Sequence, residues 1–347
     1  MQHEIKERKP LLDDHGNLTE PGYAKSLILD YDRKAIKAGS LRIKEWDYYL
    51  IANDDFAVAL TIADNSYMGL DSISLLDFGI PWEKTTSSMS FFTLGKLDLP
   101  SSSANGDIEH GNKHYHISFK KLGIARTLTF HMDNFCDGKP IEGTIELIDA
   151  PAESMVIATP FDKDKHFYYN QKINCMPASG VVKFDGKEYE FEPTTSFGVL
   201  DWGRGVWTYK NTWYWGSASG LVDGLCFGFN IGYGFGNTSA ASENMIFYDH
   251  KAHKLDQVTF NIPMKSDGKG GETEDYMKPW TFTSSDGRFE MDFVPVLDRA
   301  SDTNVLLICS DQHQVFGRFT GTAVLDDGTK LEVKNLLGFA EKVYNKW

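Results

Sequence analysis

The stretch WDYYLIANDDFAVALTIADNSY (Trp46–Tyr67) decides the fold, because WYWGSASGLVDGLCFGFNIGYG (Trp213–Gly234) matches it later in the chain. Large apolar residues occupy every second position of Phe56–Ile62, which is typical of a strand with one buried face. A short apolar run follows each copy, Ile73–Phe78 in one case and Met245–His250 in the other. The copies lie about 170 residues apart, which indicates a duplicated domain rather than a solenoid repeat.

Other segments extend this pattern. Ile117–Phe130 is similar to Trp280–Phe293, and Glu142–Leu147 is similar to Thr320–Leu325. The segment Val181–Glu192 contains an Asp-Gly pair, which supplies the positive φ of a two-residue turn and predicts a hairpin. Chance similarity among β-rich segments is the alternative explanation of the matches. We predict an all-β chain with two tandem antiparallel barrels packed side by side.

The predicted organisation has three parts. Residues 1–35 are polar and rich in turn-forming residues, so we expect an arm that docks on the body. Residues 36–178 would form the first barrel and residues 179–347 the second. A short helix is possible around Tyr23–Leu29 of the arm, and helical periodicity otherwise occurs only in a short run, Leu336–Tyr344, at the C-terminus.

Composition excludes several classes of function. The chain has 347 residues and a net charge of −14, which argues against binding to nucleic acid. No apolar run is long enough for a membrane span, and the charged N-terminus does not resemble a secretory signal. The cysteines, which include no C-x-x-C pair, suit reduced thiols in a cytoplasmic protein. They are Cys136, Cys175, Cys226 and Cys309. The oligomeric state does not follow from the sequence.

The segment FGVLDWGRGVWTYKNTWYWGSASG (Phe197–Gly220) gathers aromatic rings around two central charges, Asp201 and Arg204. Many rings around few charges are typical of a pocket for a small molecule with an apolar body and a polar end. A structural ion pair between Asp201 and Arg204, and rings that simply fill a core, are the alternatives. The predicted aromatic ligand-binding residues are Trp202, Trp207, Tyr209, Trp213 and Trp215.

Long motifs carry a resemblance to a known family. They are PLLDDHGNLTEPGYA (Pro10–Ala24), RIKEWDYYLI (Arg42–Ile51), NQKINCMPASG (Asn170–Gly180), VLDWGRGVW (Val199–Trp207) and NTWYWGSASG (Asn211–Gly220). On these motifs nearly the whole chain resembles the bacterial family catalogued as domain of unknown function 2804. That family is similar, more distantly, to a lipocalin-like group of tandem β-barrels that includes carotenoid hydratases and fungal cyclases.

The resemblance implies two lipocalin-like barrels and an apolar ligand. In the hydratase-like relatives, an acid beside tryptophan at the start of the second half is associated with protonation of the substrate. By motif, this position matches Asp201-Trp202 in the present sequence. The chain departs from the histidine-rich pattern of those relatives, because Gly203 and Arg204 follow directly.

Two further clusters are candidate ligand-binding residues. Asn170 and Lys172 could hold the polar end of a ligand, or satisfy backbone groups at a strand edge. His114 and His116 share one face of a predicted strand, as in some metal sites. Lysines stand where a cupin would place glutamate, so we predict neither a metal nor a cofactor.

Three hypotheses of function remain open. The favoured one is binding of an apolar or amphipathic small molecule (isoprenoid, fatty or polyketide-like) in a barrel lumen or inter-domain seam. Asp201, Arg204 and Lys172 would orient its polar end. The second is a cofactor-free hydratase, isomerase or cyclase with Asp201 as general acid. The third is a non-catalytic scaffold with filled barrels.

Overall fold

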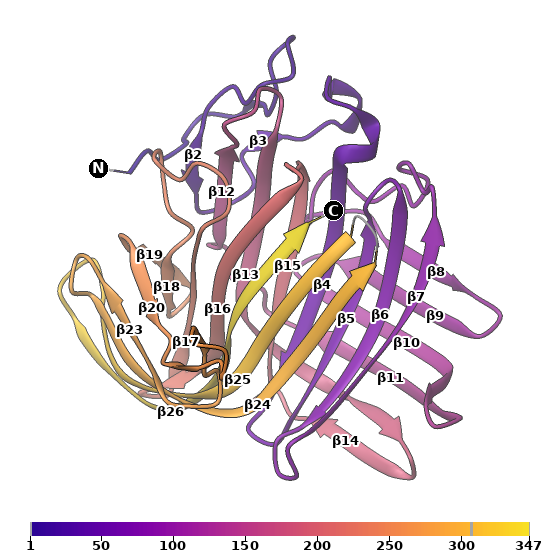
Figure 1. Ribbon diagram of the computed structural model, residues 1–347, viewed down its shortest axis with the longest axis vertical. Coiled ribbons are helices and arrows are strands. Elements are labelled where there is room, and N and C mark those ends of the chain that lie inside the picture. Colours follow the sequence, from indigo (N-terminus) through magenta and orange to yellow (C-terminus); the bar gives the residue numbers. More distant parts are fainter. Residues whose placement is uncertain (1, 306–307, 347) are drawn as a thin grey trace.

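The computed structural model describes residues 2–305 and 308–346, and nearly all of its regular structure is β. Two large, strongly curled sheets pack against each other (Figure 1). In the described residues, helix is limited to two short 3₁₀ turns, η1 (Arg33–Ala35) and η2 (Ser40–Arg42). The predicted all-β class with two tandem barrels is confirmed.

The first sheet runs in the order β7-β6-β5-β4-β15-β13-β11-β10-β9-β8, with β2, β12 and β14 paired beside this path. Its strands are β2 (Gly22–Ala24), β4 (Ile43–Ala52), β5 (Phe56–Asp64), β6 (Met68–Asp77), β7 (Trp82–Phe91), β8 (Ile108–Asn112), β9 (Tyr115–Leu122), β10 (Ala125–Cys136), β11 (Lys139–Leu147), β12 (Met155–Pro160), β13 (Phe167–Phe184), β14 (Lys187–Phe191) and β15 (Phe197–Val206).

The second sheet runs in the order β19-β18-β17-β16-β26-β25-β24-β23-β20. Its strands are β16 (Lys210–Val222), β17 (Leu225–Tyr233), β18 (Met245–Tyr248), β19 (Lys251–Lys254), β20 (Val258–Asn261), β23 (Trp280–Ser284), β24 (Phe289–Val305), β25 (Ile308–Val324) and β26 (Lys330–Lys346). Two small ribbons complete the fold. They are β1 (Lys9–Pro10) with β3 (Leu29–Asp30), and β21 (Met264–Ser266) with β22 (Glu272–Glu274).

The strand orders of the two sheets correspond, as a duplication requires. From β4 the first sheet continues through β5, β6 and β7, and from β16 the second continues through β17, β18 and β19. The matched segments Trp46–Tyr67 and Trp213–Gly234 therefore form equivalent hairpins. The later matches are displaced by one strand. Glu142–Leu147 lies in β11, which corresponds in position to β24, whereas Thr320–Leu325 begins in β25.

The chain passes from the first sheet to the second between Val206 and Lys210. The expected boundary after residue 178 falls inside β13, a single long strand of the first sheet, and needs correction. The predicted hairpin at Val181–Glu192 does form, from the end of β13 and β14. It belongs to the first sheet, because β15 then returns between β13 and β4.

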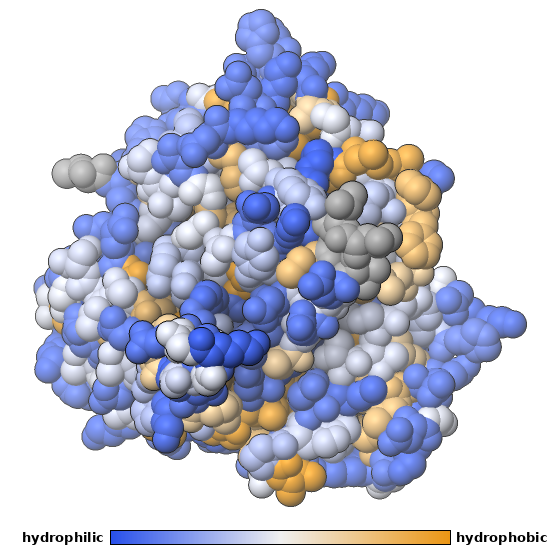
Figure 2. All heavy atoms as spheres, in the orientation of Figure 1, coloured by the Kyte–Doolittle hydropathy of each residue, from blue (hydrophilic) through white to orange (hydrophobic). Residues whose placement is uncertain are grey.

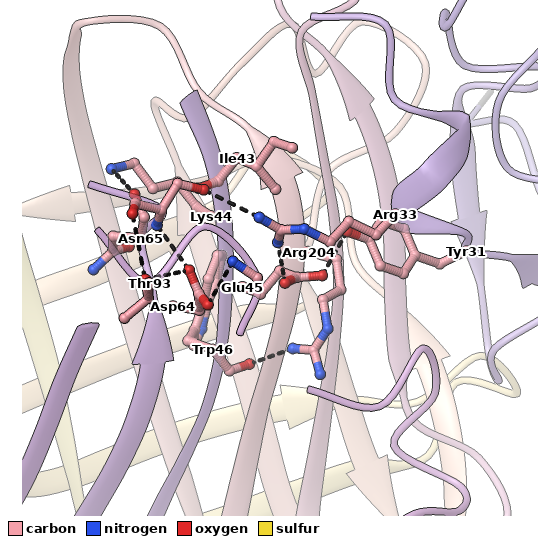
Figure 3. Close-up of polar contacts among 12 residues, drawn as sticks. Tyr31, Arg33, Ile43, Lys44, Glu45, Trp46, Asp64, Asn65, Thr93 and Arg204 are labelled. Atoms are coloured by element: carbon pink, nitrogen blue, oxygen red, sulfur yellow. Dashed lines mark hydrogen bonds and ion pairs between the residues drawn. The ribbon is translucent and has the colours of Figure 1, made fainter. Parts of the chain in front are cut away.

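The N-terminal arm docks on the first barrel at the start of β4 (Figure 3). Tyr31 donates a hydrogen bond of 2.7 Å to a carboxylate oxygen of Glu45, and Arg33 forms an ion pair with the other oxygen. Earlier in the arm, β2 pairs with the edge of β12. The first residues of the arm contact the second half of the chain instead, where His3 N–H donates to the Ala240 carbonyl and Gln2 Nε2 to the Leu255 carbonyl, both at 2.8 Å.

Apolar side chains gather inside each curled sheet and also between the sheets. We call the contact between the sheets the seam; β4, β13 and β15 form one side, and β16, β25 and β26 form the other. Every residue of β15 is buried, because one face of this strand packs on the first core and the other faces the seam. A polar side chain on the seam face of β15 is therefore shielded from water.

The visible surface is largely hydrophilic, in keeping with the net charge of −14 (Figure 2). Exposed apolar side chains gather at the end of β7, where Met89, Phe91 and Phe92 lie. No helix among the described residues has the length and apolarity to cross a membrane. The four cysteines carry free thiols, as predicted.

Candidate functional site

Asp201 and Arg204 lie on opposite faces of β15, so the expected shared site is wrong. Side chains alternate along a strand, and residues three apart point in opposite directions. Trp202 and Arg204 face the interior of the first barrel, whereas Val199 and Asp201 face the seam. The structural ion pair considered between Asp201 and Arg204 is excluded for the same reason.

Arg204 is a fully buried organising residue of the first barrel. Its Nη2 donates to Asp47 Oδ1 at 3.0 Å and to the Pro100 carbonyl at 2.7 Å. Its Nη1 donates to the Trp46 carbonyl at 2.8 Å, a contact drawn in Figure 3. The guanidinium also lies 4.4 Å from the centre of the Trp202 ring. These contacts give Arg204 a structural role on the face of β15 opposite the seam.

Lys172 is the ion-pair partner of Asp201. The two residues are directly opposite in the register of β13 and β15, and Lys172 Nζ lies 2.8 Å from Asp201 Oδ2. Asn170, one pleat away on β13, donates to Asp201 Oδ1 at 2.6 Å. The Lys172 ammonium also lies 3.8 Å from the centre of the Trp215 ring on the second sheet. The structure thus brings together Asn170, Lys172, Asp201 and Trp215, four of the predicted site residues.

Glu341 of β26 enters the same buried region from the second sheet. Trp213 Nε1 donates to its Oε1 at 2.9 Å, and Gln314 Nε2 donates to its Oε2 at 3.0 Å. Burial raises the pKa of Glu341 to about 7; the Trp213 hydrogen bond and Lys172 oppose the shift, and Asp201 adds to it. Glu341 is therefore a carboxyl group that gains and loses its proton near neutral pH.

Glu243, from the β17–β18 connection, is a third carboxyl group at the seam. Burial raises its pKa, and Asp201 adds to the shift while Lys172 opposes it. We call Lys172, Asp201, Glu243 and Glu341 the acid–lysine cluster. Burial and Asp201 raise the pKa of both glutamates, and Lys172 opposes the shift at each, with Lys254 adding to this at Glu243 and Arg299 at Glu341. A buried proton is therefore expected on one of the two glutamates.

Sequence reasoning missed both glutamates. Glu341 is the only acid in the run LLGFAEKVY (Leu336–Tyr344), and a lone acid in an apolar run is the signal that could have found it. The helical periodicity of that run is misleading, because it lies in strand β26. Glu243 lies in an irregular connection, and nothing in its local sequence distinguishes it.

The predicted tryptophans do not line a common hollow. Trp202 packs in the first core, against Tyr31 and Tyr169. Trp207 and Trp213 belong to a ring cluster in which both pack on Phe235, with centroid distances of 4.7 and 5.5 Å. Core filling, the alternative interpretation, describes these three rings. Tyr209 is 40% exposed at the molecular surface.

A groove of about 250 Å³ opens in the seam beside the acid–lysine cluster. Val199 and Phe339 lie in its wall, and Asp201 and Glu341 follow them by two residues on the same strands. Trp215 packs edge-on against Phe339 of the groove wall at 4.7 Å, and the Lys172 ammonium of the cluster lies over the same ring at 3.8 Å. The apolar lining comes from both sheets and includes Leu50, Phe197, Val199, Phe316, Leu337 and Phe339.

The two candidate histidines lie outside the seam. His114 pairs with Asp133 at 3.2 Å and His116 with Glu109 at 3.0 Å, and both rings are substantially exposed. Residues 2–305 and 308–346 contain no group of histidine, cysteine and acidic side chains that could hold a metal ion. The histidines are therefore separated from the other predicted ligand-binding residues.

Solved structures share this fold at low sequence identity. CghA, solved with Sch210972, has a TM-score of 0.53 and 12% identity, covering 96% of this chain and 97% of that one. An AttH candidate from Nitrosomonas europaea has a TM-score of 0.50 and 12% identity, covering 90% and 96%. Kievitone hydratase from Nectria haematococca has a TM-score of 0.49 and 11% identity, covering 97% and 98%.

These likenesses concern the fold, and they agree with the expected tandem lipocalin-like architecture. No curated protein has a significant sequence match to the chain. The family resemblance seen in the sequence motifs is confirmed at full length. Residues 2–347 match the model described as domain of unknown function DUF2804, and the chain belongs to that family.

Proposed function

We propose that this protein binds an apolar or amphipathic small molecule in the seam groove. The observation that carries the proposal is an open groove of about 250 Å³ with an apolar wall contributed by two sheets. Ligand pockets of about 300 Å³ and more are usual, so the groove suits a small ligand or one that extends into solvent. Polar side chains at the rim, among them Asn53, Thr195 and Asn335, would contact the exposed end of the ligand.

The similar fold of CghA supports this choice of ligand class, because CghA was solved with the compound Sch210972. The support is limited to architecture. The identity of 12% carries over no residue role and no ligand. The isoprenoid, fatty or polyketide-like character of the ligand is therefore part of the proposal.

Native mass spectrometry of the full chain incubated with farnesol or dodecanoate tests the proposal. Leu337→Trp should fill the groove and remove the bound mass, because Leu337 is buried in the groove wall. Leu225→Trp is the matched control, since Leu225 is 42% exposed on β17 and lies outside the groove. Equal binding by the wild type and Leu337→Trp would place the ligand elsewhere, and absence of binding for both compounds would contradict the proposal.

A second candidate function, cofactor-free proton transfer, rests on the acid–lysine cluster. A general acid works best when its pKa lies near the working pH, and the pKa of Glu341 is raised to about 7. Asp201 is held in an ion pair with Lys172. In this proposal Glu341 delivers a proton to a carbon of the ligand, as a hydratase, isomerase or cyclase requires. Lys172 then stabilises the carboxylate left on Glu341, and Asp201 stabilises the positive charge formed on the ligand.

In this proposal Trp215 links the groove to the cluster, because its ring contacts both Phe339 and Lys172. The test is deuterium uptake from heavy water into a compound that binds the groove. Wild-type protein should label the compound and Glu341→Gln should bind it without labelling it. Labelling by Glu341→Gln at the wild-type rate would rule out this role for Glu341.

A further inference from the structure

A second polar pocket lies at the mouth of the first barrel, away from the seam. It has about 20 Å³ of space, and its lining includes Asp47, Tyr49, Ser103, Lys121 and Arg126. A volume of this size admits one water-sized group. The connection between β7 and β8 contributes Pro100, Ser102, Ser103 and Gly106 to the lining.

Arg126 is the unusual side chain of this pocket. It is 3% exposed, and its Nε has no hydrogen-bond partner among residues 2–305 and 308–346. Its Nη2 donates to the Ser103 carbonyl at 3.2 Å, and its Nη1 lies 3.8 Å from the sulfur of Met176. Within those residues no carboxylate oxygen lies within 4.0 Å of its guanidinium. Buried guanidinium groups are normally paired, so an orphaned donor at a pocket points to a missing anion.

The charges around Arg126 strengthen this argument. Lys121 donates to the same Ser103 carbonyl at 3.4 Å, and burial and Arg126 lower the pKa of Lys121 to about 8. The nearby carboxylate, Asp47, is already paired with Arg204 at 3.0 Å. Asp107 is exposed and accepts the backbone N–H of Lys121 at 2.9 Å. Three cationic side chains therefore share one buried carboxylate, in a protein whose net charge is −14.

We infer that this pocket binds one small monovalent anion between Arg126 and Lys121, either free chloride or a single carboxylate oxygen of a ligand whose remaining atoms lie outside the pocket. The anion would accept the free Nε–H of Arg126 and a proton of the Lys121 ammonium. Tyr49 hydrogen-bonds Arg126 at this pocket and stays neutral, because burial raises the pKa of its hydroxyl. A phosphate group is too large for the space. This site is independent of the proposed seam function.

Chloride-35 NMR on the full chain tests the inference directly. With methanesulfonate holding the ionic strength constant, added chloride should show saturable line broadening in wild-type protein. Arg126→Gln should weaken the apparent affinity for chloride at least tenfold, as measured from the line broadening. Lys121→Gln, which should disturb folding less because Lys121 is half-buried, should weaken chloride binding as well. Lys113→Gln, on the exposed turn of the same β8–β9 hairpin, should leave it unchanged.

Formate separates the two sources of the anion. Displacement of chloride by millimolar formate supports a carboxylate-binding pocket, whereas chloride binding that formate does not displace supports a halide site. Inorganic phosphate should not compete in either case. Broadening that is absent from the wild type, or equal in wild type, Arg126→Gln and Lys121→Gln, would overturn the inference.

Discussion

Replacement of Glu341 by glutamine removes a seam carboxyl group whose pKa burial raises to about 7. Glutamine keeps the shape of the side chain and an oxygen that can accept the Trp213 N–H bond. It cannot ionise, so it mimics the protonated acid. The difference in stability between wild type and Glu341→Gln therefore isolates the ionisation of Glu341 from that of all other groups.

The expected effect follows from the pKa of Glu341, which burial raises from 4.5 to about 7. Between these values the folded protein holds a proton that the unfolded chain has lost. The free energy of unfolding of the wild type therefore falls as pH rises through this window. Each pKa unit corresponds to about 1.4 kcal/mol, so the penalty reaches about 3 kcal/mol above pH 8. Relative to wild type, Glu341→Gln should gain about this much stability between pH 4.5 and pH 8.

Urea unfolding at half-unit intervals from pH 4.5 to pH 8.5 measures this difference. Glu332→Gln is the control, because Glu332 lies on the same strand β26 with its side chain 59% exposed, paired with Lys330. The free energy of unfolding of Glu332→Gln, plotted against pH, should run parallel to that of the wild type. A difference between wild type and Glu341→Gln that stays constant across the range would refute the assignment of a shifted pKa to Glu341. It would also remove the basis for its proposed role as proton donor.

Three further predictions concern stability and are checked by denaturant unfolding at pH 7. Asp201→Asn should lower the free energy of unfolding by about 3–5 kcal/mol, because it leaves the buried Lys172 without its ion-pair partner. The double variant with Lys172→Met should recover most of this loss, and a loss that the second change does not reduce would contradict the pairing. Arg204→Lys should lower the free energy of unfolding by about 3 kcal/mol or more, because lysine cannot reproduce the several directed hydrogen bonds of the guanidinium. The binding of farnesol or dodecanoate per folded molecule should not change. Gly203→Ala should destabilise by about 1–3 kcal/mol, because a Cβ there would lie 1.9 Å from the Trp46 ring, and wild-type stability would show that the ring can move aside.

Much of the fold was predictable because strand formation is local. Alternating apolar residues and Asp-Gly turns predicted the strands, and the match of Trp46–Tyr67 with Trp213–Gly234 predicted two similar barrels. The boundary between the barrels was not predictable from these signals. The long strand β13 crosses the expected boundary, and only its pairing with both β14 and β15 assigns it to the first sheet.

The sequence by itself determined which strand residues share a face. Asn170 and Lys172 are two apart and lie together, and the odd spacing of Asp201 and Arg204 sends them to opposite faces, because both pairs lie in regular parts of their strands. Only the tertiary structure decided that Glu341, far away in the sequence, meets Asp201 in the seam. The position of Glu341 depends on the pairing of β26 with β16 and on the packing of one sheet on the other. Its unusual pKa is likewise a property of the closed seam, because desolvation requires atoms from both sheets to exclude water.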